Sequence, residues 1–227
     1  MSYKRNQLEA AITQIVNPSA KDPPSVLRTR IKRLLELDRN LGCKHRSPKP
    51  EDSNFAFFSE EAPGTGADVS FSEYEAFALF TALTIMAHGW SQSFAVFVMR
   101  HVRSDLMEEH ARILSLDPKK LFDMNAIRAK ARPGDLYVES TDPIFLTVAQ
   151  KALGARNNRK AAADCAICNG LKDVQEFGKQ MNAASLTMWE VTKMAHEFHK
   201  KLREVEPRRR GRAPKRTAGG SREVTNR

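Results

Sequence analysis

One helix constrains the fold of this chain more than any other segment. Ser72 and Glu75 form a capping box, in which each side chain satisfies a free backbone N–H at the start of a helix. The segment that follows, residues 73–88, is apolar on nearly every side, with Phe77, Leu79, Phe80, Leu83, Ile85 and Met86. A helix without a polar face has no side to offer to water. We therefore expect it in the centre of a core or in a dimer interface, ending at Gly89.

Residues 25–41 predict a second, amphipathic helix. Ser25 is a good N-cap after Pro23-Pro24, which cannot be helical. At about 100° per residue, one side of this helix is apolar and carries Leu27, Ile31, Leu34, Leu35, Leu37 and Leu41. The opposite flank carries Arg28, Lys32, Glu36 and Arg39, with Thr29 and Arg33 beside them. Arg30 lies at the edge of the apolar stripe, where its stem can pack while its charged head reaches solvent. Asp38 falls inside the stripe, so either the helix bends there or Asp38 pairs with a buried cation.

The rest of the first half predicts two more helices and a β-hairpin. The helices run over residues 6–16 and from Ser91 or Ser93 to about residue 116. The hairpin joins strands at 55–59 and 67–71 through a Pro-Gly turn.

Beyond residue 116 the pattern mixes helices and strands. It predicts helices at 117–123, 171–181 and 185–205 and strands at 136–139, 144–149 and 163–168. The last helix has Met188, Val191, Ala195, Phe198 and Leu202 spaced for one face. We expect a small α+β unit here. From residue 207 onward there is too little apolar content to fold, so we expect disorder.

These elements predict a mainly α protein in three parts. Residues 1–116 form a winged helix-turn-helix-like domain with core or dimer helices, residues 117–206 a small α+β domain, and residues 207–227 a disordered basic tail. The order of helix, turn, basic amphipathic helix, hairpin and long helix is typical of the winged helix-turn-helix.

The formal net charge of +10 sits at the two ends of the sequence. Residues 1–54 hold eleven Lys and Arg against six Asp and Glu, and residues 207–227 hold eight against one. The sequence has no long uncharged apolar segment of the kind that predicts a membrane span. The first residues lack the apolar core of a secretion signal. Three cysteines are too few for a disulfide scaffold. We expect a cytoplasmic protein.

The basic helix face suggests binding to double-stranded DNA. A helix needs such a face to follow the phosphates and enter the major groove. The candidate DNA-contacting residues are Arg28, Thr29, Lys32, Arg33 and Arg39. The alternative interpretation is that a charged outer face only keeps the helix soluble.

The first hundred residues resemble the MerR-type DNA-binding fold. The resemblance lies in Leu27-Arg28-Thr29-Arg30, in Leu34-Leu35-Glu36 with the hairpin behind it, and in the passage from Phe71-Ser72-Glu73-Tyr74-Glu75 to His88-Gly89-Trp90-Ser91. It implies a bacterial transcriptional regulator that is a homodimer, with the second helix in the major groove and the wing on the DNA backbone. The wing segment departs from the family, because it carries Glu60 and Glu61 and no arginine.

The basic tail is a second candidate DNA contact. It contains Arg208, Arg209, Arg210, Arg212, Lys215 and Arg216. The run resembles a minor-groove AT-hook, although Ala213 interrupts the Arg-Gly-Arg-Pro core. Neutralising six phosphates would give a salt slope of about −5. The alternative is a non-enzymatic interaction or scaffold protein whose tail binds RNA or any other polyanion.

Signals for metal binding or catalysis are weak. Cys165-x-x-Cys168 and His196-x-x-His199 supply the residue types of a zinc site, but two small core cysteines and two surface histidines account for them better. We assign no metal or other cofactor. The sequence has no G-x-S-x-G, Walker, dinucleotide or H-E-x-x-H motif, and we expect no enzymatic activity.

Overall fold

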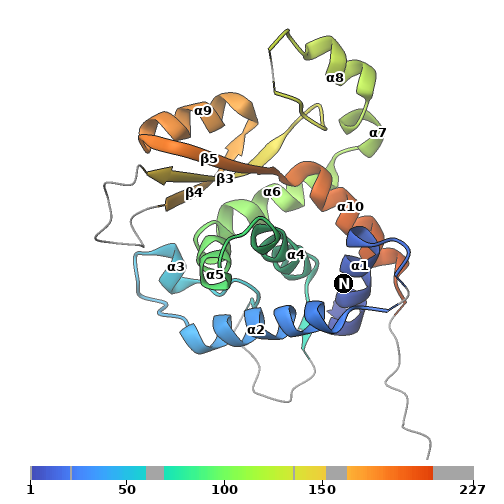
Figure 1. Cartoon of the computed structure of the whole chain (residues 1–227), viewed down its shortest axis with the longest axis vertical. Helices are drawn as coiled ribbons and strands as arrows, with labels where there is room; N and C mark the ends of the chain where they lie inside the picture. Colours follow the sequence, from blue (N-terminus) through green and yellow to red (C-terminus); the bar gives the residue numbers. More distant parts are fainter. Residues whose placement is uncertain (1, 21, 60–68, 135, 152–162, 207–227) are drawn as a thin grey trace, which may run out of the picture.

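The computed structural model describes residues 2–20, 22–59, 69–134, 136–151 and 163–206. This part of the chain is mainly helical with two small antiparallel sheets (Figure 1), which confirms the predicted class. The helices are α1 (Arg5–Val16), α2 (Ser25–Leu41), α3 (Pro50–Ser53), α4 (Glu73–Ala87), α5 (Gln92–His101), α6 (Arg103–Ser115), α7 (Pro118–Leu121), α8 (Met124–Lys130), α9 (Gly170–Gln180) and α10 (Val191–Glu204). The strands are β1 (Tyr3–Lys4), β2 (Ser70–Phe71), β3 (Ile144–Lys151), β4 (Ala163–Asn169) and β5 (Ala183–Glu190).

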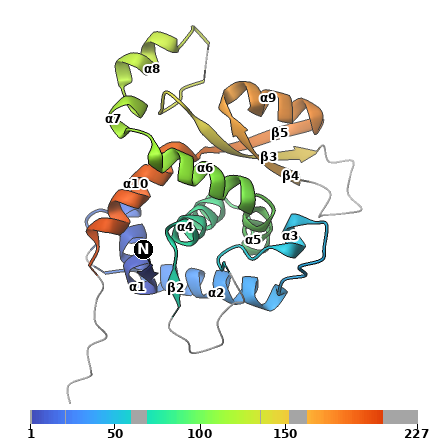
Figure 2. The ribbon, with the colours of Figure 1, turned by 180° about the vertical axis from the view of Figure 1, so that it is seen from behind.

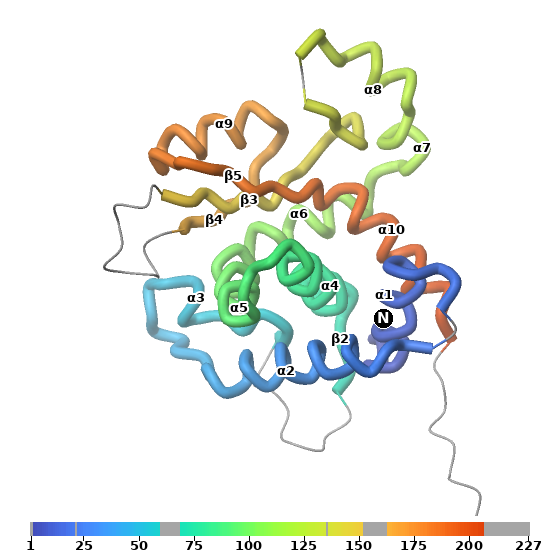
Figure 3. The backbone as a smooth tube through the Cα atoms, in the orientation of Figure 1, coloured from blue at the N-terminus to red at the C-terminus, as the bar shows by residue number. Residues whose placement is uncertain are grey.

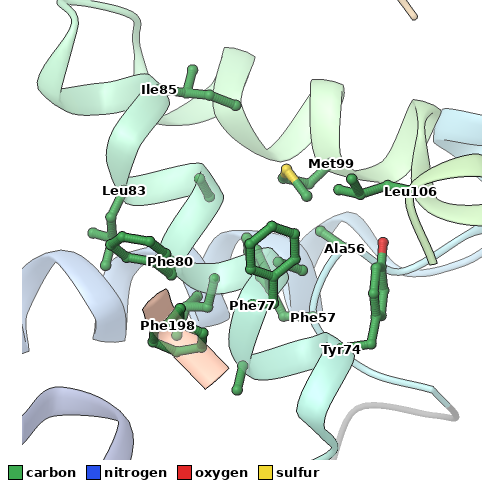
Figure 4. Packing of buried hydrophobic residues seen from close by; sticks show 14 of the residues in the cluster. Ala56, Phe57, Tyr74, Phe77, Phe80, Leu83, Ile85, Met99, Leu106 and Phe198 are labelled. Atoms are coloured by element: carbon green, nitrogen blue, oxygen red, sulfur yellow. The ribbon is translucent and has the colours of Figure 1, made fainter. Parts of the chain in front are cut away.

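The apolar helix expected at residues 73–88 is α4, and it lies in the centre of the core. The capping box is confirmed: the N–H of Glu75 donates to Ser72 Oγ at 3.2 Å, and the N–H of Ser72 donates to the Glu75 carboxylate at 2.6 Å. On α4, the ring of Phe80 stacks on that of Phe198 from α10, with centroids 4.8 Å apart (Figure 4). Of the two places expected for this helix, it occupies the core of its own chain.

A three-stranded sheet covers one side of this helical core. β3 is the central strand, with β4 and β5 antiparallel on either side. Leu146 and Trp189 are cross-strand partners whose side chains belong to the main core. Phe145 and Cys168 lie on the opposite face and pack with Val174 of α9. Figure 2 shows α9 lying along the sheet. The sheet therefore lies between α9 and the helices around α4, with the central strand β3 buried along most of its length.

Predictions for the second half are partly confirmed. The strands expected at 144–149 and 163–168 are β3 and β4, and the helix expected at 171–181 is α9. The helix expected at 185–205 is wrong in its first part, because residues 183–190 form β5 and pair with β3. Residues 136–139 form no strand.

The hairpin expected at residues 55–71 is not formed by the described residues. Residues 55–58 are not a strand, because the N–H groups of Ala56 and Phe57 donate to the carboxylate of Asp38 at 3.0 Å. Ser70–Phe71 is a strand, but its partner is Tyr3–Lys4. Glu60, Glu61 and the predicted turn lie outside the described residues.

The long helix expected to end near residue 116 is two helices. α5 and α6 meet at Val102, where the backbone leaves helical geometry at φ −88° and ψ 7°. The short helix after Asp117 is confirmed as α7, with the Asp117 carboxylate accepting the N–H of Lys119 at 3.0 Å. The pattern of the sequence does not predict α8.

The winged helix-turn-helix is not confirmed. In that motif two consecutive helices pack on each other across a short turn, whereas α1 packs chiefly along α10 (Figure 3). Gln7 Nε2 in α1 also donates to the carbonyl of Val205 at 3.1 Å. The main buried cluster contains residues from both sides of residue 116, and the division at that position stays a prediction.

Candidate nucleic-acid interface

A buried ion pair fixes the inner face of α2. The side chains of Asp38 and Arg100 are 0% and 3% exposed, and Arg100 Nε donates to Asp38 Oδ1 at 2.6 Å. The same guanidinium donates to the carbonyl of Asp38 at 2.6 Å and to that of Gly42 at 2.9 Å. Charge-assisted hydrogen bonds are strong away from water, so the C-terminal half of α2 is held firmly against α5. The expectation that Asp38 meets a buried cation is confirmed.

The outer face of α2 is open to solvent and presents four of the five residues expected to contact DNA. These four are Arg28, Thr29, Lys32 and Arg33, and all are exposed. Helical spacing places Thr29, Lys32 and Arg33 opposite the buried Ile31 and Leu34. We call Arg28, Thr29, Lys32 and Arg33 the outer face of α2.

The cations of this outer face are only lightly engaged. Arg28 Nε lies 3.6 Å from Glu9 Oε2, and Lys32 Nζ lies 3.5 Å from Glu36 Oε1. The pair of Lys32 with Glu36 is exposed, and such pairs contribute little free energy and exchange readily for another anion. Glu9 is largely buried, but its contact with Arg28 is long. Within the described part of the chain, Arg33 forms no ion pair. The outer face of α2 is thus available to phosphate.

Arg39 is the exception. Its side chain is half-buried, its Cζ lies 6.0 Å from the ring centroid of Phe58, and its Nε is buried without a hydrogen-bond partner among the described residues. Such a cation–π contact holds the guanidinium against the segment that follows α2. Arg39 therefore packs α2 and is not brought to the outer face.

The loop after α2 adds cations that the sequence interpretation did not single out. Lys44, Arg46 and Lys49 are all exposed, and the N–H of Lys44 donates to the carbonyl of Asp52 at 2.8 Å, which turns the loop back. Their spacing of two to three residues, among prolines directly after a basic helix, could have identified them in the sequence. They extend the positive surface beyond the C-terminal end of α2.

The six basic tail residues, Arg208, Arg209, Arg210, Arg212, Lys215 and Arg216, lie outside the described residues. The described chain ends beside α1, where Val205 accepts the hydrogen bond from Gln7. Arg5, in the same turn of α1, donates to the carbonyl of Arg28 at 2.9 Å. The last described residues therefore lie near the first turn of α2.

The predicted cysteine and histidine pairs do not converge on a zinc site. Cys165 packs in the main core and Cys168 under α9, on opposite faces of β4. Burial raises the pKa of the Cys165 thiol, so it stays protonated. His196 hydrogen-bonds the carbonyl of Ile113 at 3.0 Å. Among the described residues, no three His, Cys, Asp or Glu side chains gather as a metal-binding group.

Comparison of the sequence with models of known protein families gives no match, and comparison with curated proteins gives none. The MerR resemblance and the homodimer it implies stay predictions. Within the described ranges, none of the helices has the length and apolar character needed to cross a membrane.

Proposed function

We propose that this protein binds double-stranded DNA through the outer face of α2 and acts as a transcriptional regulator. The observation that carries the proposal is the open arrangement of Arg28, Thr29, Lys32 and Arg33 on a helix whose opposite side is fixed by a buried ion pair. The regulatory role rests on the MerR resemblance alone.

The dimensions of α2 suit this role. Its 17 residues span roughly 25 Å, and a helix fits the major groove of B-DNA, which is about 12 Å wide. Arg28 and Lys32 are placed to meet phosphates, while Thr29 and Arg33 project from the middle of the exposed side toward base edges. A helix held firmly on its inner side loses little conformational entropy when it binds.

The tail supplies a different kind of contact. Its cations neutralise phosphates without reading bases, so they raise affinity for any sequence. The last described residues lie near the first turn of α2, and the residues that follow them can therefore reach the duplex that α2 binds.

The test measures duplex binding by fluorescence anisotropy over a range of salt concentrations, together with sequence selection from a random pool. We expect Lys32→Ala/Arg33→Ala to weaken binding about tenfold or more and to flatten the sequence preference. Lys172→Ala/Lys179→Ala on α9 removes the same charge from a remote exposed surface and serves as the matched control.

The contrary result is equally clear. If the α2 double variant binds like the α9 control while deletion of residues 207–227 abolishes all binding, the outer face of α2 is not the interface. Equal affinity for single-stranded RNA would favour the non-enzymatic interaction protein with a polyanion-binding tail.

A further inference from the structure

An apolar pocket of about 410 Å³ opens between α1, α2 and the C-terminal end of α4. Its walls include Ile12, Ile15, Val26, Leu27, Phe80 and Leu83. This volume falls within the range of small-molecule sites. Phe80 and Leu83 leave α4 on the same side (Figure 4).

The rim of the pocket leaves large apolar side chains in water. Val16 is 75% exposed and Val26 is 60% exposed, although both line the pocket. Burying an exposed valine stabilises a complex because it removes apolar surface from water. The pocket therefore favours an occupant with an aliphatic portion.

One charged residue, Arg30, lines this pocket in the described part of the chain. The two threonine hydroxyls of the lining are already satisfied: Thr13 Oγ1 donates to the carbonyl of Glu9 at 2.7 Å, and Thr84 Oγ1 donates to that of Phe80 at 3.1 Å. Arg30 forms no ion pair with any described residue. A guanidinium at the mouth of an apolar cavity matches a carboxylate, which it binds through paired N–H donors.

We propose that this pocket binds an aliphatic carboxylate, with the alkyl chain between α1 and α4 and the carboxylate on Arg30. The same occupant acts on α2, and this second step rests on the proposed DNA binding. Arg30 directly follows Thr29 and lies one turn before Arg33, so neutralising its charge lowers the positive potential of the outer face of α2. The ligand therefore weakens DNA binding.

Ligand binding is tested without DNA, by titration calorimetry of the full chain with sodium decanoate. 1-Decanol has the same number of carbon atoms without the charge, and decyltrimethylammonium carries a ten-carbon chain with the opposite charge. We expect saturable decanoate binding, weaker decanol binding and the weakest binding for the cation. Arg30→Gln lowers decanoate affinity about tenfold or more and leaves decanol affinity unchanged, because only the charge is removed.

Two further variants test whether the ligand occupies the pocket itself. Ala87→Phe fills the pocket and weakens both decanoate and decanol, whereas Arg128→Gln on α8, outside the pocket lining, leaves both unchanged. Absence of saturable binding, or an unchanged decanoate affinity in Arg30→Gln, overturns the proposal. The proposal is also overturned if the chain binds no decanoate and sedimentation shows a dimer that Ala87→Phe dissociates. This surface would then be an interface between two copies of the chain.

The effect on DNA is read separately. Saturating decanoate lowers the affinity of the wild-type chain for duplex DNA several-fold, and Arg30→Gln abolishes this response. Decanoate binding without any change in DNA affinity overturns the regulatory step and leaves the ligand site in place. A chain that binds no DNA at all overturns the proposed function, while the calorimetric result still decides the pocket.

Discussion

At the residue scale, Asp38 connects local sequence to distant structure. Its carboxylate accepts hydrogen bonds from Arg100 and from the N–H groups of Ala56 and Phe57. An acidic residue inside an apolar stripe predicts a buried partner, but it does not say which cation along the chain supplies it. The partner lies 62 residues away, and helical periodicity carries no information over that separation.

Replacing the charge at Asp38 should be costly. Asp38→Asn leaves the Arg100 guanidinium buried without its counter-ion, and we expect a loss of about 3 to 5 kcal/mol in the free energy of unfolding. Urea denaturation followed by circular dichroism measures it. Asp105→Asn, at an exposed position on α6, should change stability by no more than about 0.5 kcal/mol. Equal losses in the two variants would refute a structural role for this pair.

His110 predicts a pH dependence of stability. Its buried ring stacks on Phe77 with centroids 4.7 Å apart. Burial, helped by His199 and His196 nearby, lowers the pKa of His110 to about 4. In the unfolded chain the imidazole of His110 has a pKa of about 6.5. Below this pH the unfolded chain therefore binds a proton at His110 more readily than the native chain does. This contribution to the free energy of unfolding is therefore present above pH 6.5 and is lost as the pH falls toward 4.

The measurement compares urea denaturation at pH 7.5 and pH 4.5 in wild type and in His110→Phe, which keeps an aromatic ring and removes the titrating group. We expect the wild type to lose about 2 to 3 kcal/mol more than the variant over this interval. His45→Gln, at an exposed position, should behave like the wild type. A His110→Phe slope identical to the wild-type slope would contradict the assignment.

At the scale of elements, local signals identify helices better than strands. α4 begins at the capping box that the sequence predicts. α2 spans the predicted residues, but the expectation that Ser25 is its N-cap is wrong: Ser25 is the first helical residue, and Pro24 holds the cap position without a side-chain hydrogen bond. The sequence pattern does not predict β5, because the apolar spacing of α10 continues by coincidence to Met188. This segment is a strand because it pairs with β3, and that pairing is long-range. The four exposed residues of the candidate interface followed from helical periodicity. The packing of Arg39 on Phe58 depends on the path of the chain after α2 and could not be predicted.

The cap of α4 offers a test at this scale. Ser72→Ala removes the acceptor for the N–H of Glu75, and we expect the free energy of unfolding to fall by about 1 kcal/mol. Ser72→Asp retains a side-chain acceptor and should keep most of the wild-type stability. Chemical denaturation of both variants decides the point. The assignment of Ser72 as the cap fails if Ser72→Asp is destabilised as much as Ser72→Ala.

At the scale of the whole molecule, the last described residues lie beside the basic helix α2. The contacts of α1 with α10 and α2 place Val205 near Arg28. The sheet and α9 lie on the other side of α4 (Figure 1). Among the described residues, exposed cations gather on the outer face of α2 and in the loop behind it.

Removal of residues 207–227 should change the salt dependence of DNA binding. Six phosphate contacts made by the tail account for a slope of about −5 in the plot of log affinity against log salt, so deletion should flatten the slope by up to that amount. The preference among sequences should remain, because phosphate contacts do not read bases. Lys172→Ala/Lys179→Ala should leave the slope as it is, and an unaltered slope in the deletion variant would exclude the tail from the interface.

The packing of α1 on α10 also has a consequence for the order of events during synthesis. The hydrogen bond between Gln7 and Val205 spans 198 residues, and the apolar side of α1 has its chief helical partner in α10. A ribosome makes the chain from the N-terminal end at about 5–20 residues per second. The apolar face of α1 therefore stays uncovered for at least about ten seconds before α10 leaves the ribosome and packs on it. Nascent chains of this protein are expected to need a chaperone during that interval more than after release.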